Sequence, residues 1–330
     1  MKIRILGAGD IRQALSMAEA IEVVKDAFVQ LSSKQAQSPV RSSLTLKSPG
    51  EVALIMPAYL GKTKALGAKM VSVIPQNPQR GLPAVQALVV LFSASSGGPL
   101  AILEGTCLTQ VRTGAATGAA TQMLSRSNSR KLALFGAGGQ ALSQAEGVLA
   151  VRKVERISIF DVLAEKAEVL KVALKGSPWG QKVEVLSARS PLEALEGADI
   201  IVTATNSRQP VFDGKALGEG AHINALGSFR PEMQEVDEET IRRGWIFVDS
   251  VAACLEEAGD LIIPLKKGLI READILAELG EVISGKKPGR RNDQEVTYFK
   301  SVGNAVQDIS VAQAILRRAE EKGLGREVEL

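Results

Sequence analysis

Between residues 130 and 260 the sequence alternates short apolar runs with segments whose apolar positions recur at helical spacing. Several of the runs are hydrophobic at consecutive positions, which is typical of parallel strands covered on both faces. The expected strands are 131–136, 156–161, 182–187, 198–205, 221–227 and 245–250. The expected helices are 139–151, 163–175 and 190–196. This alternation predicts an α/β fold with a doubly wound Rossmann sheet.

The N-terminal third has a different pattern. Residues 16–31 predict an amphipathic helix that begins with a capping box of Ser16 and Glu19. The β-prone stretches after it are separated by Pro and Gly turns without intervening helices, which favours an antiparallel or mixed sheet. Further helices are expected at 109–124 and at 301–322, the second ending at Gly323. This part is therefore predicted to be an α+β domain.

The composition excludes several classes of protein. The 330 residues are 45% hydrophobic and carry a net charge of +3 with both signs interspersed, which indicates a globular protein without a nucleic-acid partner. No apolar run is long enough for a secretory signal or a membrane span, so we expect a soluble, cytoplasmic protein. Cys107 and Cys254 lack metal-ligand spacing, and the single histidine, His222, lies in an apolar run. We expect no metal site.

Residues 131–161 contain every part of a dinucleotide-binding βαβ unit, from a strand and a glycine-rich turn to a second strand ending in Asp161. Gly136 permits the tight turn, Gly138 lets the backbone approach a pyrophosphate, and Ala141 keeps helix and strand close. The residues of the turn expected to bind the cofactor are Gly136, Gly138, Gly139, Gln140 and Ala141. A carboxylate at Asp161 accepts hydrogen bonds from ribose hydroxyls and repels a 2′-phosphate. NAD(H) is therefore favoured, with NADP(H) as the alternative.

A second glycine pair, Gly7 and Gly9, also follows a strand-like run. Its third small position is occupied by Arg12, whose size prevents a close approach of helix and strand. No acidic strand end follows at a suitable distance. We therefore assign the cofactor to the turn at Gly136.

Three basic residues of the N-terminal part, Arg41, Lys69 and Arg112, stand among apolar or small residues. A desolvated cation requires an anion. Arg112 is also expected near the N-terminus of the helix at 109–124, where the helix dipole disfavours a cation unless an anion is bound. Together they predict a clamp for a substrate carboxylate.

The sequence resembles the ornithine cyclodeaminase/mu-crystallin family along nearly its whole length. The matching segments are 69–83, 102–121, 134–141, 223–237 and 300–308. The resemblance implies a homodimer. It implies a substrate-binding and dimerisation domain at 1–120, joined by the C-terminal helix at 303–330, and an NAD-binding Rossmann domain at 121–302.

The resemblance also implies roles for individual residues. Arg41, Lys69 and Arg112 would hold the substrate's α-carboxylate, with Lys69 and Arg112 as the catalytic residues. Glu51 would be a polar substrate contact. The lining implied around the nicotinamide consists of Thr203, Leu226, Gly227, Ser228 and Ser301.

The implied chemistry is hydride transfer between a nicotinamide and the α-carbon of a small amino or imino acid. Where ornithine cyclodeaminases carry an Asp that assists ring closure, this sequence has Phe229, which cannot exchange a proton. The resemblance therefore favours an NAD(P)H-dependent imine reductase or amino-acid dehydrogenase. Its substrates would be Δ1-pyrroline-2-carboxylate, related cyclic imino acids, or pyruvate with ammonia. An ornithine cyclodeaminase and a mu-crystallin-like binding protein are the alternatives.

Overall fold

The computed structural model describes residues 1–46 and 50–329 of the chain. Contacts divide the chain into two compact units: unit 1 comprises Met1–Arg112 and Asn304–Leu330, and unit 2 comprises Thr113–Gly303. The boundary falls within helix α3 (Gly105–Leu124). Leu330, the end of the predicted C-terminal segment, lies outside the described residues.

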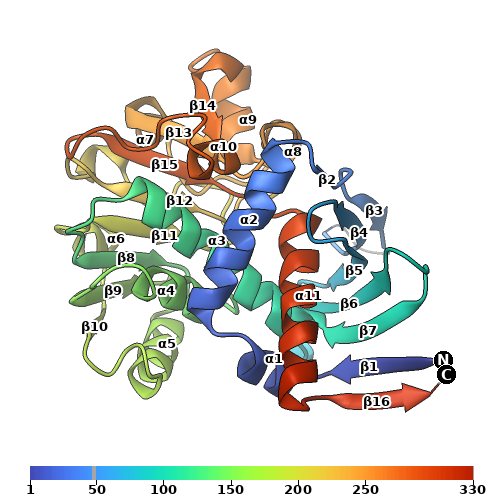
Figure 1. Cartoon of the computed structure of the whole chain (residues 1–330). Helices are drawn as coiled ribbons and strands as arrows, with labels where there is room; N and C mark the ends of the chain where they lie inside the picture. Colours follow the sequence, from blue (N-terminus) through green and yellow to red (C-terminus); the bar gives the residue numbers. More distant parts are fainter. Residues whose placement is uncertain (47–49, 330) are drawn as a thin grey trace. The chain divides into compact units, whose positions relative to one another are not determined.

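Unit 1 is built on an eight-stranded sheet ordered β16-β1-β7-β6-β5-β4-β2, with β3 also paired to β4. β1 and β7 are parallel, whereas the other pairs are antiparallel, so the predicted mixed sheet is confirmed. Its strands are β1 (Lys2–Leu6), β2 (Ala36–Gln37), β3 (Ser42–Thr45), β4 (Val52–Leu60), β5 (Ala65–Val73), β6 (Val85–Ser93), β7 (Pro99–Glu104) and β16 (Arg326–Glu329). β1 and β16 pair, which brings the two ends of the chain together (Figure 1).

The helices of unit 1 include the amphipathic helix expected at 16–31 and most of the helix expected at 301–322. They are α1 (Ala8–Ala14), α2 (Met17–Ser32), the short 3-10 turn η1 (Asn77–Arg80) and α11 (Ala305–Lys322). α2 begins with the predicted capping box, in which the Ser16 side chain accepts from the Glu19 N–H and the Glu19 carboxylate accepts from the Ser16 N–H. α11 packs on β4, β5 and β6 and beside α2, and it ends at Gly323 in the left-handed conformation.

The close approach of α11 to the sheet depends on Gly67 in β5. A Cβ atom at Gly67 would lie 2.3 Å from the carbonyl oxygen of Val90 and 3.1 Å from Cδ1 of Ile309 on α11. Because side chains alternate along a strand, Lys69 points to the same covered face as Gly67. The packing therefore brings the first turns of α11 over Lys69.

Unit 2 contains an eight-stranded sheet ordered β10-β9-β8-β11-β12-β15-β13-β14. Its strands are β8 (Lys131–Phe135), β9 (Arg156–Phe160), β10 (Glu184–Ser187), β11 (Ile200–Thr203), β12 (His222–Ala225), β13 (Gly244–Val248), β14 (Ile275–Glu278) and β15 (Val296–Lys300). All the paired strands described are parallel, and the strand order reverses between β8 and β11. The predicted doubly wound Rossmann fold is confirmed. Ligands of such sheets bind at the carboxyl ends of the strands where the order reverses.

The remaining helices connect these strands. They are α4 (Ala141–Leu149), α5 (Ala164–Gly176), α6 (Pro191–Leu195), α7 (Glu238–Arg243), α8 (Val251–Glu257), α9 (Gly259–Lys266) and α10 (Leu279–Ile283), with the 3-10 turns η2 (Gly214–Ala216) and η3 (Glu272–Asp274). None of the helices within residues 1–46 and 50–329 combines the length and the hydrophobicity that a membrane span requires.

The structure corrects the predicted C-terminal helix and adds strands. α11 begins at Ala305, so residues 301–304 are not helical as the sequence pattern predicted. β14, β15 and β16 were not anticipated. In the sheet, β15 lies between β12 and β13. In the sequence, β13 is the nearer of these two strands, and residues 249–295 still separate it from β15. Strand pairing between segments so far apart in sequence produces no local sequence pattern from which the strand order could be predicted.

Candidate active site

A buried cluster of Lys69, Arg112 and Asp308 lies in unit 1. The ammonium of Lys69 is 2.8 Å from Oδ2 of Asp308, and Nε of Arg112 donates to Oδ1 of the same carboxylate at 3.0 Å. A terminal nitrogen of Arg112 donates to Oε1 of Gln307 at 2.8 Å. Lys69, Arg112 and Asp308 each come from a different element, namely β5, α3 and α11.

The cluster has one more positive charge than negative. Two cations share one carboxylate, and all three side chains are at least nine-tenths buried. An unbalanced buried charge is costly, so a second anion would be stabilised here. The arrangement fits a carboxylate-containing ligand.

Burial lowers the pKa of Lys69 to about 8. Asp308 acts in the opposite direction and supports the charged form, whereas Arg112 and Arg41 lower the pKa further by repulsion. A lysine with a pKa near neutral can both carry a positive charge and release a proton in the physiological range.

Arg41 belongs to the same electrostatic environment, since its charge acts on Lys69. Arg41 immediately precedes β3, whose first residue, Ser42, is paired with Ile55 on β4. The next residue of β4, Met56, is paired with Lys69 on β5. Glu51 is half-buried just before β4, and among the described residues no hydrogen bond or ion pair joins its side chain to Lys69 or Arg112.

The structure corrects one argument about Arg112. Helix α3 begins at Gly105, so Arg112 lies about two turns inside the helix rather than near its N-terminus. The helix dipole therefore does not explain the need for an anion. Asp308, which sequence reasoning missed, supplies the partner. An acidic residue in the first turn of a helix usually interacts with the dipole, so the sequence did not distinguish Asp308 from an ordinary helix start.

The glycine turn after β8 has the geometry expected of a cofactor cradle. Gly136 has φ +93°, and a Cβ atom there would lie 2.7 Å from the Ala204 carbonyl oxygen, on the loop after β11. At Gly138 and Gly139 a Cβ would meet no atom within 4 Å. Ala141 is fully buried at the start of α4. The turn therefore packs tightly at Gly136 and is open at Gly138 and Gly139, as a pyrophosphate-binding turn requires.

Asp161 directly follows β9 and contacts this turn. Its Oδ2 accepts the N–H of Ala137 at 2.7 Å, and its Oδ1 accepts the N–H of Leu163 at 2.9 Å. A carboxylate has about four acceptor sites, so both oxygens keep capacity for further donors such as ribose hydroxyls.

The residues expected around the nicotinamide follow three neighbouring strands. Thr203 ends β11, Leu226–Ser228 follow β12, and Ser301 follows β15. Because these strands are parallel neighbours, their carboxyl ends lie at one edge of the sheet. The side chains of Thr203 and Ser228 are fully buried and bond to the protein itself, so this edge offers mainly backbone groups.

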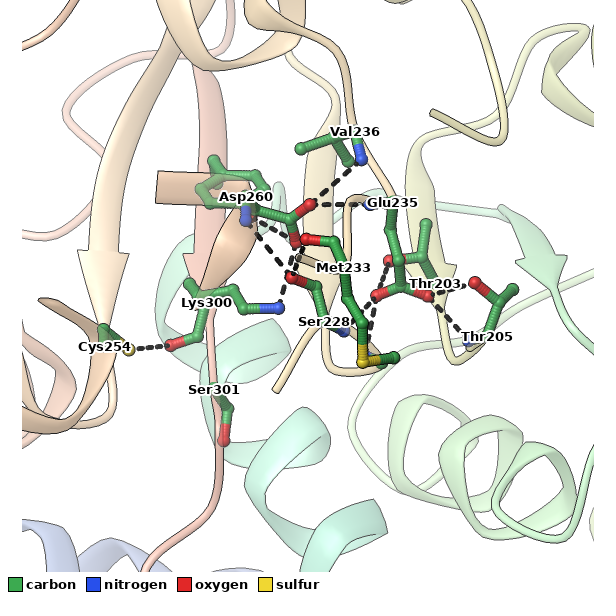
Figure 2. Close-up of polar contacts among 12 residues, drawn as sticks. Thr203, Thr205, Ser228, Met233, Glu235, Val236, Cys254, Asp260, Lys300 and Ser301 are labelled. Atoms are coloured by element: carbon green, nitrogen blue, oxygen red, sulfur yellow. Dashed lines mark hydrogen bonds and ion pairs between the residues drawn. The ribbon is translucent and has the colours of Figure 1, made fainter. Parts of the chain in front are cut away.

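Sequence reasoning also missed the acidic groups that hold this edge together, two of which, Glu235 and Asp260, are labelled in Figure 2. Ser301 donates to Asp249 at 2.7 Å, and the ammonium of Lys300 lies 3.0 Å from Asp260. Glu235 accepts hydrogen bonds from Thr203, Thr205, Gly227 and Ser228. These acids are scattered over residues 235–260, and only the fold assembles them.

The single histidine and both cysteines are buried side chains. His222 is fully buried in β12 and shares a hydrogen bond with Thr297, and burial lowers its pKa to about 3, so it is neutral. Cys107 and Cys254 are buried free thiols. Among the residues that the structure describes, no group of three His, Cys, Asp or Glu residues could hold a metal ion. Phe229 packs against the core of unit 2.

A parallel sheet with a reversal point, a left-handed glycine after β8 and an acidic residue after β9 define the Rossmann class of α/β proteins. The sequence profile of the ornithine cyclodeaminase/mu-crystallin family matches residues 1–323. The chain belongs to this family.

Three known relatives match along nearly the whole chain. A Δ1-pyrroline-2-carboxylate reductase of Bacillus cereus is 42% identical over 98% of this chain and 99% of its own length. The structure of the Thermococcus litoralis Δ1-pyrroline-2-carboxylate reductase, in complex with NADH and L-proline, has a TM-score of 0.94 and 39% identity, covering 99% of this chain and 100% of the other. An archaeal alanine dehydrogenase, described as a dimer with bound NAD, has a TM-score of 0.92 and 34% identity, with complete coverage of both chains.

Proposed function

We propose that this protein is an NAD(H)-dependent imine reductase that converts Δ1-pyrroline-2-carboxylate, or a closely related cyclic imino acid, to the amino acid. The observation that carries this proposal is the buried cluster of Lys69, Arg112 and Asp308, which has one excess positive charge. The reductases of Bacillus cereus and Thermococcus litoralis named above support the choice of substrate.

Unit 2 would bind the cofactor. Gly138 and Gly139 would contact the pyrophosphate, where a Cβ would meet no protein atom, and Asp161 would accept bonds from the adenosine ribose. Thr203, Leu226–Ser228 and Ser301 would border the nicotinamide, with Gln140 at the start of α4 beside the phosphates. The absence of a basic residue directly after Asp161 supports NAD(H) over NADP(H). When bound, the cofactor supplies the hydride.

Unit 1 would bind the imino acid. Arg112 and Arg41 would hold its carboxylate, and Glu51 would contact its polar atoms. The ammonium of Lys69 would donate the proton that the imine nitrogen gains, while the imine carbon gains the hydride. Holding the carboxylate would orient the imine carbon, which is the main contribution binding can make to this step. We assign substrate binding to residues 1–120 with 303–330, and cofactor binding to 121–302.

We also propose a homodimer formed through the exposed face of the unit 1 sheet. Ile55, Met70 and Leu88 are paired across β4, β5 and β6, and their exposed fractions are 38%, 57% and 52%. Leu44 and Phe92 extend the same face. A contiguous apolar face of this kind indicates a protein partner. The dimeric alanine dehydrogenase supports a second copy of this chain as that partner.

A cytoplasmic location is part of the proposal. Two buried free thiols suit a reducing compartment.

The test is an assay of purified protein with NADH and Δ1-pyrroline-2-carboxylate, and separately with NADH, pyruvate and ammonia. Consumption of NADH with formation of proline is expected in the first assay. A third assay supplies ornithine with catalytic NAD. Proline and ammonia formed there without net NADH change would replace the proposal by ornithine cyclodeamination, whereas nucleotide binding without turnover of any substrate would favour a binding protein.

A variant tests the substrate cluster within the same assay. Arg112→Ala should lower kcat/KM for the imino acid by about 100-fold or more, because the substrate carboxylate loses its guanidinium partner. Arg318→Ala removes an arginine that is also paired with carboxylates but is 44% exposed, and it should change kcat/KM by less than about twofold. Equal effects of the two substitutions would remove Arg112 from the site.

A further inference from the structure

Glu235 is a buried acid whose carboxylate accepts hydrogen bonds from two separate segments of the chain. Its Oε1 accepts the Thr205 N–H at 2.6 Å and the Thr205 hydroxyl at 2.8 Å. Its Oε2 accepts the Thr203 hydroxyl at 2.9 Å and the N–H groups of Gly227 and Ser228 at 2.6 and 3.2 Å. Five donors therefore converge on a single side chain that has no exposed surface (Figure 2).

The two loops are the ones that follow β11 and β12. These strands are parallel neighbours, so the loops leave the sheet at the same edge. The loop after β11 also contacts the glycine turn, since Ala204 and Thr205 lie against Gly136. Glu235 thus joins the two backbone segments expected to border the nicotinamide.

The backbone of Glu235 is held in place by Asp260. Its N–H, and that of Val236, donate to Oδ1 of Asp260 at 2.7 and 3.3 Å. The other oxygen of Asp260 is 3.0 Å from the ammonium of Lys300. Burial raises the pKa of Glu235, and the negative charge of Asp260 raises it further. The positive charge of Lys300 acts in the opposite direction and offsets part of this effect.

We propose that Glu235 is a positioning residue that fixes the loops after β11 and β12 for the nicotinamide end of the cofactor. The inference rests on the proposed function in two respects, namely that the cofactor is NAD(H) and that its nicotinamide lies beside these two loops. Its role is distinct from that of Asp161, which contacts the glycine turn and the adenosine end.

A glutamine cannot replace this acid, for a geometric reason. Backbone N–H groups can only donate, and both carboxylate oxygens face at least one of them. In Glu235→Gln, whichever way the side-chain amide turned, its NH2 group would face the N–H of Thr205 or those of Gly227 and Ser228. At least one buried donor would lose its acceptor, and the loop carrying it would shift.

The experiment compares binding of NADH and of ADP-ribose, which lacks the nicotinamide, to wild-type protein and to Glu235→Gln. Isothermal titration measures both affinities, and circular dichroism with thermal unfolding checks the fold. We expect the variant to bind NADH about tenfold more weakly, while its affinity for ADP-ribose stays within about twofold. A residue that merely supported unit 2 would change both affinities together, or neither, and either result would overturn the proposal.

Asp199→Asn is the matched control. Asp199 is also a carboxylate that accepts backbone N–H groups, those of Arg130 and Lys131, but it lies before β11 and holds the amino end of β8. Its substitution should leave both affinities within about twofold of wild type. A loss of NADH affinity in this control equal to that in Glu235→Gln would overturn the proposal.

If Glu235→Gln does not fold, Thr205→Val provides the second test. It removes the hydroxyl bond to Oε1 and keeps the backbone bond. A smaller but selective loss of NADH affinity, with ADP-ribose unaffected, is expected, and unchanged NADH affinity would count against the inference. Wild-type protein that bound neither ligand would instead refute the proposed NAD(H) function.

Discussion

At the scale of single residues, the central feature is one carboxylate shared by two cations. Asp308 pairs with Lys69 and Arg112, and the Lys69 ammonium keeps a pKa of about 8 because Asp308 counteracts burial and repulsion. The proposed chemistry needs Lys69 protonated, both to attract a carboxylate and to donate a proton. The protonated form is present below its pKa and is lost as the pH rises through it.

Asp308→Asn tests this relation. Removing the carboxylate takes away the interaction that raises the pKa of Lys69, so the pKa should fall below its wild-type value. The decline of kcat/KM for the imino acid with rising pH, expected at about pH 8 in wild type, should move to lower pH. The pH profile of kcat/KM measures this. Any titration of the substrate is the same with both proteins, so it cannot shift the profile. If the decline of kcat/KM at high pH did not move, Lys69 would be excluded as its origin. The control Asp199→Asn should leave the decline at its wild-type pH.

Asp161→Ser tests cofactor selection. The carboxylate follows β9 and would repel a 2′-phosphate, whereas serine is neutral and smaller. The ratio of kcat/KM for NADPH to that for NADH should rise by about tenfold or more, mainly through weaker use of NADH. Steady-state kinetics with both coenzymes give the ratio, and an unchanged ratio would show that Asp161 only supports the turn through Ala137.

At the scale of elements, the glycine turn between β8 and α4 contains three glycines, of which Gly136 and Gly138 have different requirements. Gly136 is required by the protein itself, since its φ is positive and the loop after β11 leaves no room for a side chain. Gly138 meets no protein atom and is required only if a ligand lies against it. The glycine motif thus combines a folding constraint with a binding constraint.

Substitution with alanine separates the two constraints. Gly136→Ala should destabilise the cofactor-free protein by about 1–3 kcal/mol, because a left-handed backbone and a contact with Ala204 both oppose a Cβ. Gly138→Ala should leave the melting temperature nearly unchanged and weaken NADH binding. Thermal unfolding and titration with NADH measure the two effects. Normal NADH affinity in Gly138→Ala would place the pyrophosphate elsewhere.

At the scale of the whole molecule, the unit 1 sheet has one face covered by helices and one exposed apolar face. Ile55, Met70 and Leu88 form a row across three strands of the exposed face. A contiguous apolar surface of this kind is an association surface or an aggregation hazard. The proposed homodimer would bury it.

Met70→Glu should therefore shift the protein from dimer to monomer, because a buried unpaired carboxylate is strongly unfavourable. Analytical ultracentrifugation measures the mass. Val169→Glu is the control, since Val169 is 69% exposed on α5 of unit 2 and lies outside the proposed surface. A Met70→Glu protein that stayed dimeric at the same concentrations would exclude this face as the interface.

The sequence alone determined the structural features that depend only on residues close together in the chain. The capping box at Ser16, the glycine turn at Gly136, the acid at Asp161 and the end of α11 at Gly323 are local features, and each appears where it was predicted. The alternation of strands and helices in unit 2 could be predicted for the same reason, since each segment has its own local preference. Candidate cations at Lys69 and Arg112 were also visible, as charges among small and apolar residues.

The tertiary structure decided which distant residues meet. Asp308 becomes the partner of Lys69 and Arg112 only when α11 packs on β5 at Gly67, and β15 enters the sheet between strands remote from it in sequence. Glu235 joins two loops because parallel strands end at a common edge. Such contacts depend on packing and strand order across many residues, which no local run of the chain encodes by itself.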